Sequence, residues 1–143
     1  MLLPITLTLA AAAALLNLWL ASRVVRLRLA QKVLHGDGGN MILGKRMRAH
    51  ANYVEYTPFV LILFALVEMA LGSSTWLWLL ALAYVVGRVA HGFGMDGDKP
   101  NAGRGIGILL TWLTLLILSG AALYAAYASM RTIEAPPALA AHM

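Results

Sequence analysis

The sequence predicts an all-α integral membrane protein, a four-helix bundle that forms a single domain over residues 1–143. Of its 143 residues, 61% are hydrophobic and only 12% are charged, about half the charged share of a soluble domain. So few charged side chains cannot cover a domain of this size, and the bilayer is therefore the expected solvent. This composition excludes an ordinary soluble enzyme, a disordered tail and a nucleic-acid-binding module.

Four apolar stretches are expected to cross the membrane, over approximately residues 2–22, 47–71, 76–95 and 105–130. The first is uncharged and long enough for about 30 Å of hydrocarbon. Basic residues follow this stretch but do not precede it, so we interpret it as a retained helix and not as a signal peptide. The third stretch carries Arg88 and His91, and the fourth has no charge. A tight turn at residues 72–75 makes the second and third stretches an antiparallel hairpin.

Basic residues divide the connecting segments into two classes. Seven of the eleven lysines and arginines lie around the first connection: Arg23, Arg26, Arg28, Lys32, Lys45, Arg46 and Arg48. The third connection holds Lys99 and Arg104, and the second has no charge. Because cytoplasmic loops are enriched in basic residues, we expect the first and third connections in the cytoplasm and both termini on the other side. No cysteine is present, and the histidines lack the spacing of a zinc site, so no metal is expected.

Polar residues in the second stretch fall on one face of the predicted helix. At about 100° per residue, a sector of about 100° contains Arg48, Asn52, Glu55 and Tyr56. An ionisable group inside a membrane span costs a few kcal/mol, so it requires a partner or a function. This face is expected to extend about two turns inward from the cytoplasmic end.

The third stretch repeats this pattern. One helical stripe contains Tyr84, Arg88, His91 and Met95. The two helices are antiparallel, which places Glu55 and Arg88 at the same depth. Two interpretations follow: a buried ion pair that holds the helices in register, or a polar pocket open to the cytoplasm. They are compatible, because one charged site can do both.

The chemistry of such a pocket indicates a zwitterionic peptide ligand. Arg48, with Arg26 or Arg28 nearby, can bind carboxylates in bidentate fashion. Glu55 can bind an ammonium group, and Asn52 a peptide amide. Glutathione has two carboxylates, one ammonium and two amides, and it matches this set.

A thiol ligand adds a second requirement. The glutathione thiol is mostly protonated at neutral pH, and a nearby cation favours the reactive thiolate. Arg104, at the start of the fourth stretch, is in the position to do this. Arg104 would lie at the bilayer surface, where glutathione can arrive from water and a lipophilic acceptor from the membrane.

The segment from Arg48 to Pro58 resembles the second-helix signature of the MAPEG family, the membrane-associated proteins in eicosanoid and glutathione metabolism. Its pattern is an arginine, an asparagine four residues on, a Glu-Tyr pair three further on and a proline two beyond the tyrosine. The likeness also covers the four spans, the basic first connection, an Arg-x-x-His on the third span and an arginine opening the fourth. It is greatest to the bacterial branch.

The resemblance implies a homotrimer in a bacterial inner membrane, with glutathione as co-substrate bound between subunits. The implied glutathione contacts are Arg28, Arg48, Asn52, Glu55, Tyr56 and His91. Arg28, with Arg26 as the second candidate, would reach across the interface, and Arg104 would be the catalytic residue that activates the thiol. His91 and Met95 stand where related branches carry tyrosines.

The expected function is a membrane-bound glutathione-dependent transferase or peroxidase that acts on lipophilic electrophiles. Its partners would be further copies of the chain, membrane lipids and a lipophilic acceptor. The alternative is a non-catalytic protein of the same fold that binds a lipid or another amphiphile, or serves as a scaffold.

Overall fold

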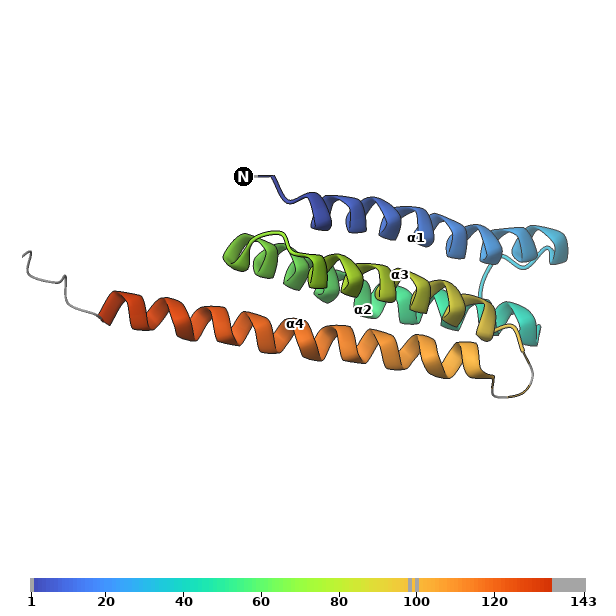
Figure 1. Ribbon diagram of the computed structural model, residues 1–143. Coiled ribbons are helices and arrows are strands. Elements are labelled where there is room, and N and C mark those ends of the chain that lie inside the picture. Colours follow the sequence, from blue (N-terminus) through green and yellow to red (C-terminus); the bar gives the residue numbers. More distant parts are fainter. Residues whose placement is uncertain (1, 98, 100, 135–143) are drawn as a thin grey trace, which may run out of the picture.

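The structure, a computed structural model, describes residues 2–97, 99 and 101–134 and confirms the all-α fold. Its helices are α1 (Pro4–Gln31), α2 (Met41–Leu71), α3 (Thr75–Gly94) and α4 (Ala102–Glu134). Each of these four helices is long and apolar enough to cross a membrane. They run antiparallel in chain order, with α2 and α3 between α1 and α4 (Figure 1). The first and third connections lie at one end, which we call the loop end, and α1 begins and α4 finishes at the other.

Two of the helices extend well beyond the predicted spans at the loop end. α1 continues to Gln31 and α2 already begins at Met41, so the first connection is only residues 32–40. Most of the basic residues assigned to that connection therefore stand on helices. The predicted spans cover only the apolar stretches, and the helices continue beyond them because lysine and arginine are good helix formers. The side chain of Asn40 fixes the new start of α2 by accepting a hydrogen bond from the Leu43 amide at 2.8 Å.

The opposite end of the bundle is fastened by the buried carboxylate of Glu68 on α2. Its oxygens accept hydrogen bonds from the amides of Ile5 and Thr6 at 3.0 and 2.8 Å. The hydroxyls of Thr6 and Ser73 donate to the same carboxylate, each at 2.7 Å. An anion at the first turn of α1 satisfies free amides and matches the helix dipole. These hydrogen bonds explain why Glu68 carries a charge within the second span although it lies away from the polar face of that span.

The apolar core fills the half of the bundle next to Glu68. Its buried members come from all four helices and include Ile5, Leu9, Val60, Phe64, Leu77 and Leu118. Toward the loop end the interior becomes polar, with buried Thr57, Arg88, His91 and Thr111. A smaller apolar cluster persists between α1 and α2, but the buried polar side chains gather between α2, α3 and α4, and a site can form there.

Close packing of α3 on α4 shapes this polar region. A Cβ added at Gly107 would lie 2.5 Å from the carbonyl oxygen of Gly87 and 2.5 Å from the Cβ of His91. A Cβ at Gly94 would collide with the backbone at Arg104. Glycine at these two contacts lets the helix backbones approach each other. This approach brings His91 on α3 against the first turns of α4.

Candidate functional site

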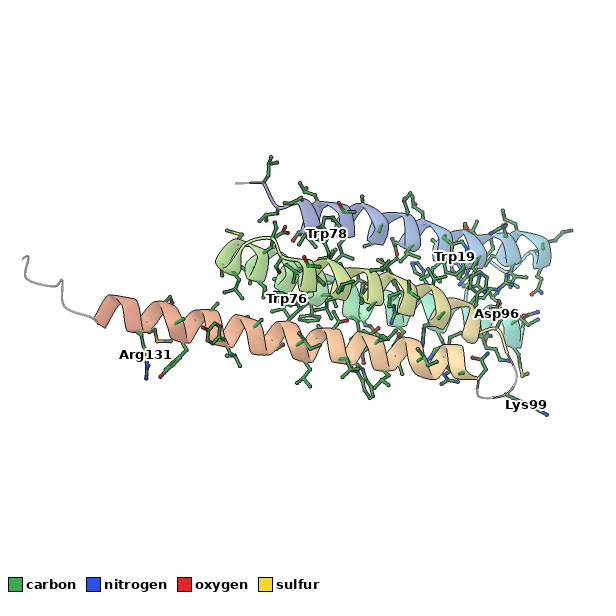
Figure 2. All side chains as sticks on the ribbon, in the orientation of Figure 1. Trp19, Trp76, Trp78, Asp96, Lys99 and Arg131 are labelled. Atoms are coloured by element: carbon green, nitrogen blue, oxygen red, sulfur yellow. The ribbon has the colours of Figure 1, made fainter. Side chains whose placement is uncertain are left out.

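A cavity of about 500 Å³ opens at the loop end, between α2, α3 and α4. Its lining residues are Arg48, Asn52, His91, Met95, Asn101, Arg104, Gly105 and Ile108. Asp96 and Lys99, labelled in Figure 2, mark this end of the molecule. Four of the predicted site residues therefore line one hollow: Arg48, Asn52, His91 and Arg104.

Two interactions position the start of α4 beside the cavity. The side-chain oxygen of Asn101 accepts a hydrogen bond from the Arg104 amide at 3.0 Å, which caps the helix. The carbonyl oxygen of Arg104 lies 3.2 Å from Nδ1 of His91. Among the described residues, the buried Nε2 of His91 has no hydrogen-bond partner. His91 therefore holds the Arg104 backbone with one ring nitrogen, while its buried Nε2 stays without a partner.

Arg88 lies behind the cavity and is bound to neutral groups. Both of its terminal nitrogens donate to Oδ1 of Asn52 at 3.0 Å, and Nη1 also donates to the Thr111 hydroxyl at 3.3 Å. Its guanidinium carbon lies 5.3 Å from the ring centre of Tyr53. These contacts fix Asn52 at the cavity wall and tie α2, α3 and α4 together.

The predicted ion pair between Glu55 and Arg88 is not present. Glu55 is exposed on α2, whereas Arg88 is buried against Asn52. The two residues were placed at the same depth, which the antiparallel packing supports. However, Glu55 is three positions beyond Asn52, and this turns it by about 60° around the helix, away from α3. The side-chain amide of Asn52, and not the carboxylate of Glu55, therefore holds Arg88 against α2.

Tyr56 and Glu55 lie outside the cavity, on the outer surface of the single chain. Tyr56 is half-buried, and its hydroxyl accepts a hydrogen bond from Trp112 Nε1 on α4 at 3.3 Å. Trp112 itself is largely exposed. A carboxylate and two aromatic residues with polar edges thus form one outward-facing strip along α2 and α4.

The two candidate first-connection arginines also lie away from the cavity. Arg28 donates to the carbonyl of Leu34 at 3.0 Å and to the sulfur of Met47 at 3.5 Å. Arg26 is exposed and contacts the backbone and hydroxyl of Ser22 on its own helix. Within one chain, neither arginine joins the group formed by Arg48 and Arg104.

The guanidinium groups of Arg48 and Arg104 are the chemically open part of the site. Both residues are exposed, and within the described part of the chain no acceptor contacts either guanidinium. Two unpaired guanidiniums that line one cavity form a strong site for carboxylates or another anion. The neighbouring Met95 and Ile108 supply apolar surface for a less polar group.

Sequence reasoning missed Asn101 and Ile108. Asn101 had a detectable signal, because an asparagine directly before a helix commonly caps it. No sequence signal indicated Ile108, since its position in the cavity depends on how α4 packs against α2.

Comparison with known proteins identifies the chain. The family model described as "MAPEG family" matches residues 6–124, from the first turn of α1 to the second half of α4. The chain belongs to the MAPEG family. Two curated relatives are both named "Inner membrane protein YecN", one from Escherichia coli strain K12 and one from Escherichia coli O6:H1 strain CFT073. Each is 35% identical over 106 residues, which cover 73% of this chain and 79% of the relative.

The MAPEG match includes every residue that lines the cavity, and it also spans the helix pairs that form it. Membership in the family agrees with the four apolar helices of an integral membrane protein. The Arg48–Pro58 signature lies on α2, and its Arg48 and Asn52 are the members that reach the cavity of a single chain.

Proposed function

We propose that this MAPEG protein is a glutathione-dependent transferase or peroxidase that acts on lipophilic electrophiles in an inner membrane. The observation that carries the proposal is the cavity in which Arg48 and Arg104 present unpaired guanidiniums beside Asn52 and His91. Arg48 binds a carboxylate of glutathione, and Nδ2 of Asn52 donates to a peptide carbonyl. Oδ1 of Asn52 is already held by Arg88, which fixes the orientation of that amide.

Arg104 supplies the chemistry in this proposal. Its guanidinium stabilises the thiolate while the thiol proton passes to water. In the transferase reaction the sulfur attacks an electrophilic carbon, a carbon–sulfur bond forms and the leaving group departs with its electron pair. In the peroxidase reaction the sulfur attacks a peroxide oxygen, the O–O bond breaks, and the alcohol leaves after taking up a proton. The sulfur is thereby oxidised to a sulfenic acid, and the thiol of a second glutathione displaces water from it to form the disulfide.

A homotrimer completes the proposed site. Glu55 and Tyr56 face outward on α2, and Arg28 lies away from the cavity. These residues contact glutathione only if a neighbouring subunit brings its cavity against them. An exposed carboxylate within a membrane span is itself costly, so cover by another subunit also stabilises it. The mass of the detergent-solubilised oligomer tests this part of the proposal.

The proposed topology follows from the distribution of charge. The loop end carries the arginines and lysines of the first and third connections, which places it in the cytoplasm. The names of the two relatives support an inner membrane. Glutathione then enters the cavity from the cytoplasm, and the lipophilic acceptor arrives from the bilayer.

The decisive experiment combines a binding assay with a turnover assay. Thermal unfolding in detergent should shift upward with millimolar glutathione, because a ligand that binds the folded state stabilises it. Purified protein should then conjugate glutathione to a lipophilic aryl halide or reduce a lipid hydroperoxide. Binding without either reaction would support a non-catalytic amphiphile-binding protein. Stabilisation by lipid but not by glutathione would contradict the proposal.

A further inference from the structure

A second cavity lies on the other side of the loop end, between α1, α2 and α3. It has a volume of about 350 Å³ and is lined by Trp19, Arg23, Arg26, Leu27, Arg46, Phe93 and Asp96. It shares no lining residue with the cavity assigned to glutathione. The wall combines positive charge with exposed aromatic surface, and the proposed function uses neither.

The charges of this second cavity are not balanced. Three arginines face a single carboxylate, that of Asp96. Asp96 forms ion pairs with Arg23 and with Arg46, the latter over 3.4 Å between Nε and Oδ1. Arg26 contacts only Ser22 of its own helix among the bonds described for it. Arg26 and part of the charge of Arg46 therefore remain available to an anion.

The aromatic part of the wall lies at the edge of the hydrocarbon. The uncharged stretch of α1 ends at Ser22, so Trp19 lies at the boundary and Arg26 in the headgroup layer. The rings of Trp19 and Phe93 pack with centroids 5.0 Å apart, and Phe93 is 61% exposed. A ligand that enters the cavity thus meets guanidiniums on its aqueous side and aromatic rings on its bilayer side.

The buried Arg23 makes this cavity a built feature of the fold. Its side chain is only 7% exposed, donates to the carbonyl of Gly92 at 2.7 Å and pairs with Asp96. Its guanidinium carbon also lies 4.9 Å from the ring centre of Trp19 and 5.6 Å from that of Phe93. These contacts orient the aromatic wall and hold Asp96 between two arginines.

We infer that this cavity binds the phosphate headgroup of an anionic phospholipid from the leaflet at the loop end. Arg26 and Arg46 bind the phosphate, and the first part of an acyl chain packs on Trp19 and Phe93. A soluble anion would gain nothing from the exposed rings. Basic residues in the headgroup layer attract anionic lipids generally. Here they line one cavity together with the apolar side chains of Trp19, Leu27 and Phe93.

Native mass spectrometry of the detergent-solubilised protein tests this inference, with phosphatidylglycerol and phosphatidylcholine as probes. We expect a bound phosphatidylglycerol that phosphatidylcholine does not replace. Arg26→Gln and Arg46→Gln should each weaken its binding about fivefold. The matched control is Lys32→Gln, which removes one exposed charge from the same end of the bundle, outside the cavity. This control should weaken binding less than about twofold.

Two results would overturn the inference. An equal loss in all three variants would mean that general electrostatic attraction, and not the cavity, holds the lipid. Competition by inorganic phosphate at the concentration of the lipid would mean a site for free anions. If Arg46→Gln lowers the melting temperature of the lipid-free protein, Arg26→Gln decides alone, because the described bonds of its side chain stay within α1.

Discussion

Arg46 and Arg48 are two residues apart on α2, but they belong to two very different regions of the loop end. Arg46 turns toward α1 and α3, where it and Arg23 contact the carboxylate of Asp96. Arg48 turns toward α4 and lines the 500 Å³ cavity with Arg104. One region satisfies much of its charge within the protein, and the other leaves two guanidiniums open.

This difference separates structure from function. A guanidinium held by a carboxylate ties helices together, and removing one partner exposes the other to an unfavourable environment. An open guanidinium contributes little to folding and is available to a ligand. The two regions should therefore respond in opposite ways to substitution: loss of stability around Asp96, and loss of binding or turnover around Arg48 and Arg104.

The largest effect is expected for Arg104→Gln. Loss of the group that stabilises the thiolate should lower kcat about 100-fold, while the affinity for glutathione changes only a few-fold. Thermal stability should stay near that of the unchanged protein, because this guanidinium forms no hydrogen bond or ion pair with a described residue. Steady-state conjugation kinetics and a glutathione titration check both expectations. Unchanged turnover would remove Arg104 from the mechanism.

The next effect is expected in the paired region. Arg23→Gln breaks a buried ion pair and a bond to the Gly92 carbonyl, and it should lower the free energy of unfolding by about 2 kcal/mol. Asp96→Asn, which alters the same pair from the other side, should act in the same direction. Unfolding in mixed micelles measures both. If glutathione affinity fell as far as stability, the two regions would not be separate.

A smaller effect sharpens the contrast between neighbours. Arg48→Gln should weaken glutathione binding about tenfold, because one charge-assisted carboxylate contact is lost. The matched control is Arg46→Gln, which removes the same charge two residues away and should leave glutathione affinity within about twofold. Calorimetric titration of both variants gives the comparison. Equal losses would mean that only the net charge of this end matters.

The smallest effect concerns the start of α4. Asn101→Ala removes the cap at the Arg104 amide and should lower the free energy of unfolding by about 1 kcal/mol. Since Arg104 then loses a fixed position, kcat should fall a few-fold. Asn101→Ser, which keeps a capping oxygen and adds no charge to the cavity, should restore both values. A variant with full kcat would show that the cap serves folding alone.

Much of the fold could be predicted from the sequence because a bilayer imposes strong constraints on composition. The apolar stretches predicted the membrane helices. The Gly-Ser-Ser-Thr link predicted the turn between α2 and α3, which the structure confirms at residues 72–74. The stripe of Tyr84, Arg88 and His91 is indeed buried. At the loop end the helices continue beyond the predicted spans, since charge marks the membrane surface and not the end of a helix.

The site was harder to predict, because it depends on how the helices are rotated against one another. Periodicity placed Asn52 and Glu55 on one face, but it could not decide which of them meets Arg88. The answer depends on about 60° of rotation and on the approach of α4, which Gly107 allows. The contributions of Glu55, Tyr56 and Arg28 require a second chain, and they stay predictions.

Cryo-electron microscopy of the oligomer in a lipid nanodisc with millimolar glutathione tests the central claim most directly. The account predicts glutathione density in the cavity between α2, α3 and α4. A carboxylate should contact Arg48, and the sulfur should lie within hydrogen-bonding reach of the Arg104 guanidinium. Glutathione bound elsewhere, or a cavity that holds only lipid while both guanidiniums contact protein acceptors, would contradict it.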